Sequence, residues 1–136
     1  HRLIPWPDTV LGLGRLKSKF VLSTLSNGNV SLLTNMAKNA GLPWDCVLSA
    51  ELARHYKPDP EVYQTAADLL GLPPGTIMMV ASHKFDLQAA QAAGFKTAFV
   101  SRPELIDSVG AEHADSGAVF DIVVNDFVEL AERLGA

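Results

Sequence analysis

A continuous apolar run that ends in a polar loop and leads straight into an Ala-rich stretch most constrains how this chain can fold. The run spans Ile77 to Val80, and such a run is typical of a strand buried on both faces of a parallel sheet. Small and apolar residues then recur at helical spacing from Leu87 to Ala93, and Gly94 follows where a helix C-cap is expected. The loop from Ser82 to Asp86 is therefore predicted at the carboxyl end of a strand, where open α/β sheets bind ligands.

The same alternation of strand and helix patterns continues along the chain. Strands are predicted over 20–25, 46–49, 77–80, 97–100 and 120–124, helices over 9–17, 30–40, 60–70, 87–93 and 127–134, and loops over 51–57 and 110–117. Strands separated by helices pair in parallel through right-handed crossovers. We predict an α/β fold with a Rossmann-like, doubly wound, mostly parallel sheet of about five strands, in a single domain over residues 1–136.

Cap residues and apolar stripes give these helices predicted ends and faces. Asp8 is expected to cap the first helix, Asp59 the helix over 60–70 and Asp126 the last. In the helix over 60–70, the residues expected to face the core are Val62, Ala66, Leu69 and Leu70.

Composition excludes several classes of protein. The net charge is −4 and the basic residues are scattered, unlike the basic face of a nucleic-acid-binding protein. No apolar run is long enough to cross a membrane, and no signal peptide is recognisable. The single Cys46 excludes an internal disulfide and a Cys-based zinc site, so a cytoplasmic location is expected. The first residue is His1 rather than Met, which suggests a chain that begins inside a longer one.

Three polar sites are predicted at or near the carboxyl ends of strands, and in a parallel sheet such sites share one edge. They are Ser26-Asn27, the connection from Lys57 to Asp59, and the loop from Ser82 to Asp86. Ser26 and the amides at the start of the next helix could bind an anion. Lys57 could reach into a cleft as a point charge, with Asp86 holding it or a water molecule.

Each of these residues also has an ordinary structural explanation. Ser26, Ser82 and Asp86 could each simply cap a helix. A lone Lys57 is more often a surface lysine, and His83 could be either a base or a solvated loop residue. The order of the residues along the chain is stronger evidence than any of them alone.

That order resembles the haloacid dehalogenase superfamily over nearly the whole chain. Residues 21–27, ending in Ser26-Asn27, look like its second motif; Lys57 within Tyr56-Lys57-Pro58 looks like the third; residues 80–86 look like the acidic fourth. Within the superfamily, the stretches 25–29, 56–63 and 81–87 are most similar to the type II 2-haloacid dehalogenases.

The resemblance implies hydrolysis of a small 2-haloacid to a 2-hydroxyacid through an aspartyl ester. It implies that Ser26 binds the substrate carboxylate and that Asn27 helps to hold the halide. Lys57 would stabilise the anionic nucleophile and substrate, Tyr63 would lie beside the carboxylate, and Asp86 would fix Lys57 and the hydrolytic water. No cofactor is implied, and the expected partner is a small anionic haloacid; by analogy, a homodimer remains open.

Two residues depart from the family pattern. Ala81 and His83 stand where better-known members have Ser and Asn, so His83 becomes the candidate substitute donor or base. Ser82, a further candidate for substrate binding, stands where magnesium-dependent phosphatases of the superfamily carry an acidic residue. A single carboxylate, Asp86, is a poor magnesium site, which favours metal-free dehalogenation over the phosphatase alternative.

The family's nucleophile strand and helical cap domain have no counterpart in this sequence. Asp8 follows Pro7 rather than an apolar strand and is rejected as the nucleophile. The chain is therefore expected to be the C-terminal core part of such an enzyme and inactive alone, with a binding module that lost catalysis as a third alternative. The missing strand would lie between the strands over 20–25 and 77–80, which are expected either to pair directly or to leave a groove.

Overall fold

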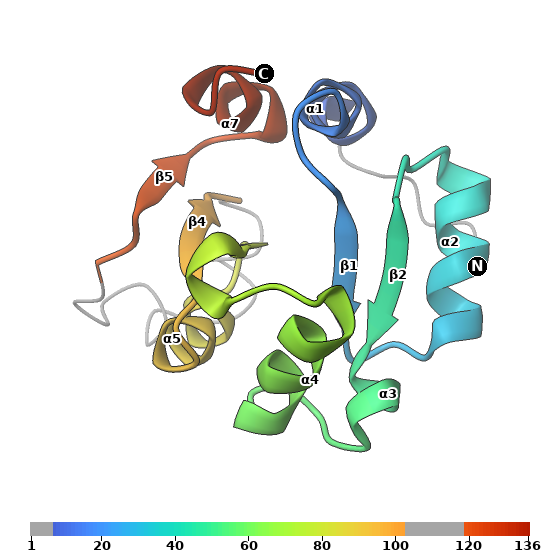
Figure 1. The fold of residues 1–136 in the computed structure, drawn as a ribbon. Coiled ribbons are helices and arrows are strands. Elements are labelled where there is room, and N and C mark those ends of the chain that lie inside the picture. Colours follow the sequence, from blue (N-terminus) through green and yellow to red (C-terminus); the bar gives the residue numbers. More distant parts are fainter. Residues whose placement is uncertain (1–6, 103–118) are drawn as a thin grey trace. The chain divides into compact units, whose positions relative to one another are not determined.

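The computed structural model describes residues 7–102 and 119–136, which fall into two compact units (Figure 1). Unit 1 contains the described residues up to Tyr56 together with Asp126–Ala136, and unit 2 contains Lys57–Asn125. That the chain is a single domain stays a prediction.

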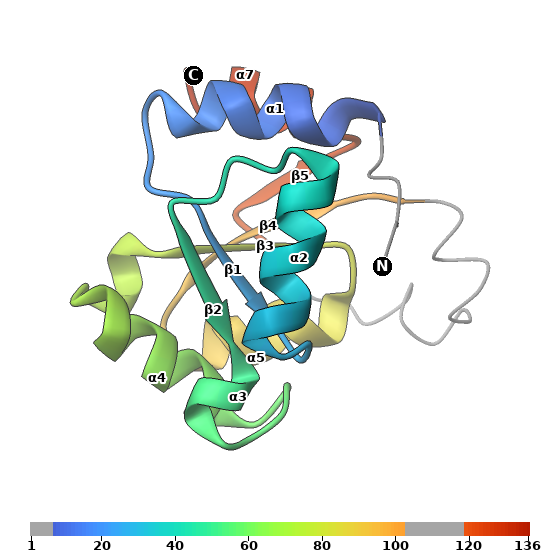
Figure 2. The ribbon, with the colours of Figure 1, turned by 90° about the vertical axis from the view of Figure 1, so that its right-hand side faces the viewer.

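Unit 1 is a βαβ unit with helices from both ends of the chain. Its elements are α1 (Pro7–Lys17), β1 (Ser23–Ser26), α2 (Val30–Ala40), β2 (Cys46–Ser49), α3 (Ala50–Ala53) and α7 (Phe127–Arg133). β1 and β2 are parallel, with Ser23 opposite Cys46 and Ser26 opposite Ser49. α2 runs alongside β2 in both views of the ribbon (Figures 1 and 2). Both strands therefore end at one edge, where the turn into α2 and the start of α3 are neighbours.

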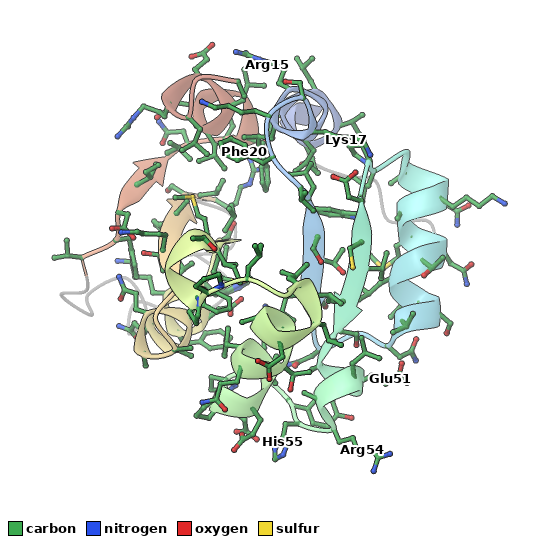
Figure 3. All side chains as sticks on the ribbon, viewed as in Figure 1. Arg15, Lys17, Phe20, Glu51, Arg54 and His55 are labelled. Atoms are coloured by element: carbon green, nitrogen blue, oxygen red, sulfur yellow. The ribbon has the colours of Figure 1, made fainter. Side chains whose placement is uncertain are left out.

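Helix α7 is held at both ends by residues of α1 and the turn after it. Asp8 lies inside α1, and its Oδ2 accepts a hydrogen bond from Phe127 N, the first amide of α7, at 2.8 Å, so the prediction that Asp8 caps its own helix is wrong. At the other end, Arg15 donates to the main-chain oxygen of Ala136 and Lys19 donates to that of Leu134, each at 2.7 Å. Arg15 is labelled on α1 in Figure 3. Cations at a helix C-terminus are favourable because unpaired carbonyls make that end negative.

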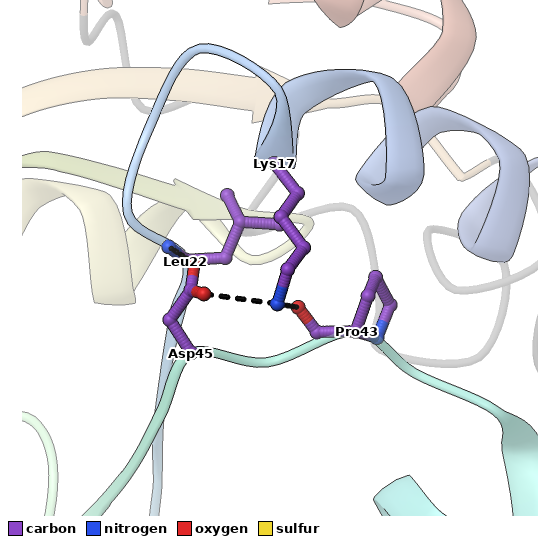
Figure 4. A network of polar contacts seen from close by, with 4 residues as sticks. All are labelled: Lys17, Leu22, Pro43 and Asp45. Atoms are coloured by element: carbon purple, nitrogen blue, oxygen red, sulfur yellow. Dashed lines mark hydrogen bonds and ion pairs between the residues drawn. The ribbon is translucent and has the colours of Figure 1, made fainter.

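Asp45 joins the end of α1 to the segments that lead into both strands of unit 1 (Figure 4). Its Oδ1 lies 2.9 Å from Lys17 Nζ, and its Oδ2 accepts a hydrogen bond from Leu22 N at 2.8 Å. Lys17 also donates to the carbonyl oxygen of Pro43 at 3.4 Å. The Leu22 amide and the Lys17 ammonium hold the pKa of Asp45 below its ordinary value of 3.8.

We expect Asp45→Asn to destabilise the chain at neutral pH and to have a vanishing effect in acid. A carboxyl group whose folded pKa is depressed adds stability above its unfolded pKa, and that stability is lost as pH falls through the folded value. The measurement is the urea midpoint of Asp45→Asn and of the parent from about pH 7 to about pH 3. Asp68→Asn, at an exposed aspartate of unit 2, is the control. A difference between Asp45→Asn and the parent that stays constant over this range would contradict the assignment.

Unit 2 is a three-stranded parallel sheet with its helices. Its elements are α4 (Pro60–Leu70), the 3₁₀ turn η1 (Pro74–Thr76), β3 (Met78–Ala81), α5 (Lys84–Ala92), β4 (Lys96–Val100) and β5 (Ile122–Val124). The strand order is β3-β4-β5, with Ala81 opposite Phe99 and Val100 opposite Val124. β4 is the middle strand, and Thr97 to Val100 are all buried.

The expectation that the strand near 77–80 is buried on both faces is wrong. All residues of β3 are half-buried, because β3 pairs with β4 alone among the described strands and forms one edge of its sheet. The most deeply buried strand is β4, which has a neighbour on each side and is buried from Thr97 to Val100. β1 likewise pairs with β2 alone among the described strands of unit 1, and the expectation for the strands over 20–25 and 77–80 stays a prediction.

The α/β class and the parallel pairing are confirmed, and most predicted elements lie where they were expected. Two details differ. The predicted loop over 51–57 begins with the short helix α3, and Leu69 of α4 is 57% exposed while Tyr63 and Ala67 are buried instead. The predicted loop over 110–117 lies outside the described residues. Within the described part of the chain, no helix combines the length and the apolar character needed to cross a membrane.

Candidate active site

Three residues from two separate stretches of the sequence form a buried polar cluster in unit 2. Lys57 Nζ lies 2.7 Å from Asp86 Oδ2, and the Tyr63 hydroxyl donates to Asp86 Oδ1 at 2.6 Å. The Lys57 and Asp86 side chains are each 10% exposed, and Tyr63 is fully buried. Both oxygens of the Asp86 carboxylate therefore have a donor in this Lys57–Tyr63–Asp86 cluster.

The local sequence explains why these side chains converge. Asp59 is the N-cap residue and Pro60 the first residue of α4, so a turn at Lys57 leads directly into the helix. Tyr63 lies one turn into α4 on its buried face, with its ring edge-on to Phe95 at 6.0 Å between ring centres. Asp86 lies in the first turn of α5, directly after the carboxyl end of β3. The cluster thus occupies the predicted end of the strand.

The environment keeps Tyr63 a neutral hydrogen-bond donor. Burial raises the pKa of its phenol well above its ordinary value, and the hydrogen bond to the Asp86 carboxylate raises it further. A protonated phenol and an ammonium group together stabilise a carboxylate that has been removed from water. The cluster can therefore keep an anionic Asp86 and a cationic Lys57 in fixed positions.

Tyr63→Phe is expected to lower the free energy of unfolding by about 1–3 kcal/mol, because it leaves a buried carboxylate oxygen without its donor. The aromatic ring and its contact with Phe95 are retained, so the hydroxyl alone is tested. Urea unfolding followed by circular dichroism measures the effect. Tyr56→Phe is the matched control, since Tyr56 is 70% exposed. Equal stability of the two variants would contradict the role given to the Tyr63 hydroxyl.

Ser82 and His83 lie between β3 and α5, beside this cluster in the sequence. His83 is the N-cap residue of α5, with an extended backbone and no capping hydrogen bond from its side chain. Its ring lies 5.8 Å from that of Phe85, and it is half-buried. The alternative in which Ser82 or Asp86 simply caps this helix is wrong, because His83 is the cap residue and Lys57 and Tyr63 bind the Asp86 carboxylate.

Ser26 is the last residue of β1, and Asn27 follows it in the turn that leads to α2. Ser26 Oγ accepts a hydrogen bond from Gly28 N at 3.1 Å, which closes a tight turn at the strand end. The N-cap of α2 is Asn29, whose side chain accepts from Leu32 N at 2.8 Å, so the prediction of a plain Ser26 cap is wrong. Asn27 is exposed.

The expectation that the first amides of α2 bind an anion is wrong for two of them. Val30 N donates to Glu51 Oε1 at 3.0 Å, and Leu32 N donates to Asn29. Glu51 reaches this amide from α3, and Figure 3 labels it there. An anion at this turn would therefore be recognised by the Ser26 and Asn27 side chains rather than by these two helix amides.

Sequence reasoning did not identify Glu51 or its neighbour Ser49. The Ser49 hydroxyl donates to the carbonyl oxygen of Gly28 and accepts from Glu51 N. The signal that could have found them is the parallel pairing itself, which places Ser49 opposite Ser26. The structure brings Lys57, Tyr63 and Asp86 together within unit 2. It describes Ser26 and Asn27 within unit 1, so convergence of the two groups stays a prediction.

Comparisons with known proteins give a consistent result. Residues 1–94 match the family model of the haloacid dehalogenase-like hydrolases. The (S)-2-haloacid dehalogenase of Xanthobacter autotrophicus is 36% identical over 98% of this chain and 52% of its own length, and that of Pseudomonas sp. strain CBS-3 is 38% identical over 75% and 46%. The chain spans about half the length of these curated relatives.

Solved structures agree with the sequence relatives. The crystal structure of the L-2-haloacid dehalogenase PA0810 superposes with a TM-score of 0.92 at 46% identity, covering 98% of this chain and 59% of that one. The defluorinating L-2-haloacid dehalogenase Rha0230 gives a TM-score of 0.90 at 44% identity, covering 98% and 55%.

Proposed function

Because this chain belongs to the haloacid dehalogenase-like hydrolases, we propose that it is the C-terminal core part of a 2-haloacid dehalogenase. The observation that carries the proposal is the buried Lys57–Asp86 ion pair, completed by Tyr63, at the carboxyl end of β3. A dehalogenase must stabilise a carboxylate nucleophile, a substrate carboxylate and a departing halide. A fixed cation in a site shielded from water is suited to all three anions.

The proposed reaction has two steps. A carboxylate oxygen of an aspartate outside this chain bonds to the carbon that bears the halogen, and the carbon–halogen bond breaks with its electron pair on the halide. Water then attacks the carbonyl carbon of the resulting ester. The alkoxide leaves as the 2-hydroxyacid after taking one proton from the water, and the aspartate returns as a carboxylate. The second proton passes through a base to solvent.

Each candidate residue has a proposed role in these steps. Ser26 binds the substrate carboxylate, and Asn27 receives the halide. Lys57 stabilises the anions, and Asp86 holds Lys57 and the attacking water. His83, the half-buried cap residue three positions before Asp86, is the candidate base. Ser82 precedes His83 in the loop after β3 and is a further hydrogen-bond donor for the substrate. Tyr63 lies beside the Asp86 carboxylate and donates to it.

The donor set disfavours the magnesium-dependent alternative. Both Asp86 oxygens already accept hydrogen bonds, and one of them faces the Lys57 ammonium at 2.7 Å, where a divalent cation would be repelled. The nearby loop offers Ser82 rather than a second carboxylate, whereas Mg²⁺ prefers carboxylate oxygens in octahedral geometry. These points support dehalogenation without a metal.

The test is halide release from (S)-2-chloropropionate by the product of the complete reading frame that encodes this chain. We expect turnover by that product in the presence of EDTA, and no turnover by the 136-residue chain alone, which lacks the attacking aspartate. Magnesium-dependent hydrolysis of p-nitrophenyl phosphate without halide release would favour a phosphatase. Turnover by the 136-residue chain at the rate of a complete dehalogenase would refute the assignment of the nucleophile.

A further inference from the structure

We propose that Ser49 and Glu51 are positioning residues that hold the Ser26–Asn27 turn in the shape that receives the carboxylate of a haloacid. The inference rests on the proposed function of that turn. Neither residue touches the substrate in this proposal, and each acts through the backbone of the turn.

The turn is anchored from one neighbouring segment, the β2–α3 junction. Ser49 is the last residue of β2 and is 3% exposed, and its hydroxyl donates to the Gly28 carbonyl oxygen. On the other side of the same residue, the Gly28 amide donates to Ser26 Oγ. Both peptide groups that flank Gly28 are thereby fixed, one by Ser26 itself and one by Ser49.

Glu51 anchors the far end of the turn. Its carboxylate accepts from the amide of Val30, the first residue of α2, at 3.0 Å. Its own amide donates to Ser49 Oγ at 3.0 Å, so the two anchors are joined to each other. The turn from Ser26 to Val30 is therefore bound at two points to one short segment, 21 residues further along the chain at each point.

This arrangement differs from an ordinary helix cap in what it connects. Asn29 already caps α2 from within the turn, and Ser49 caps α3. The additional bonds from Ser49 to Gly28 and from Glu51 to Val30 link different segments and fix the turn against β2. They also place a negative charge at the start of α2, a location where it is favoured by the helix dipole. An incoming carboxylate is thus left to the Ser26 and Asn27 side chains.

Two readouts test the proposal separately from the proposed function. The first is amide hydrogen exchange at Val30, measured by NMR on the 136-residue chain. The second is the separation of KM from kcat for (S)-2-chloropropionate in the product of the complete reading frame. The variants are Glu51→Ala, Glu51→Gln and Ser49→Ala. Glu132→Ala is the matched control, because Glu132 is a paired surface carboxylate of unit 1 on α7.

We expect Glu51→Ala to raise both the exchange rate of the Val30 amide and the KM by about tenfold, because a tenfold change corresponds to the free energy of about one hydrogen bond. The effect on kcat should be smaller. Ser49→Ala should raise KM in the same way. Glu51→Gln keeps an oxygen acceptor and should stay within about threefold of the parent in KM and exchange. Glu132→Ala should match the parent.

If Glu51→Ala had the same Val30 exchange rate and the same KM as the parent protein, the proposal would be overturned. It would also be overturned by equal KM values in Glu51→Gln and Glu51→Ala, which would mean that charge rather than position matters. Absence of halide release from the parent protein would refute the proposed function instead. The exchange readout would still show whether Glu51 holds the turn, so the two failures are distinguishable.

Discussion

Replacing Lys57 with alanine is expected to lower the free energy of unfolding by about 3–5 kcal/mol and to abolish halide release. The stability loss arises because the Asp86 carboxyl group, 10% exposed, would lose the ammonium group 2.7 Å away. The activity loss arises because the proposed reaction would lack its fixed cation. Urea unfolding and a halide assay measure the two effects. Lys96→Ala, at an exposed lysine of the same unit, is the control.

The double variant Lys57→Met with Asp86→Asn separates the two consequences. Removing both charges avoids an isolated buried ion, the methionine keeps the apolar stem of Lys57, and the asparagine can still accept from Tyr63. We expect most of the lost stability to return while halide release stays absent. Recovery of activity in the double variant would contradict a catalytic role for the pair, and failure to recover stability would contradict the buried ion pair itself.

Gly12→Ala and Gly14→Ala, two residues apart in α1, are expected to change stability in opposite directions. A Cβ at Gly12 would lie 2.5 Å from the carbonyl carbon of Phe127, whereas at Gly14 nothing lies within 4 Å. The first variant should destabilise the chain by about 1–3 kcal/mol through overpacking of α1 against α7. The second should stabilise it by about 0.5–1 kcal/mol, because alanine is the better helix former.

Both variants make the same glycine-to-alanine change in the same helix, so the gain in helix propensity is common to both. The difference in stability between them therefore reports the contact of α1 with α7. Thermal and urea unfolding of both variants beside the parent suffice. If Gly12→Ala were as stable as Gly14→Ala, the packing of α1 on Phe127 would be wrong.

The sequence predicted the ends of those helices that are marked by a proline, a glycine or a capping aspartate at the helix end itself. α4 begins at the predicted Pro60 and ends at Leu70, because Pro at the first turn and Gly after the last are local signals. α2 ends before Gly41 for the same reason, with that glycine in the left-handed conformation at φ 68°. Asp126 caps α7 as predicted, accepting from Glu129 N at 2.7 Å.

Features that depend on distant partners could not be predicted in this way. The partner of Asp8 is 119 residues away, and neither residue carries a signal for the other. β3 looked fully buried because its residues are apolar, but burial also requires a neighbouring strand on each side. The pairing of Lys57 with Asp86, 29 residues apart, was suggested by the expected edge of a parallel sheet and implied again by the family resemblance, but no local signal specified it. The catalytic roles of these residues stay predictions.

The contribution of both chain ends to unit 1 has a consequence for the order in which the protein can form during translation. Unit 2 is one uninterrupted stretch, so it is fully synthesised before the ribosome reaches Asp126. Unit 1 begins earlier, but α1 has no α7 to pack against until the last residues emerge, and Arg15 and Lys19 find their acceptors only at Ala136 and Leu134. Within residues 7–136, unit 1 is thus begun before unit 2 and completed after it.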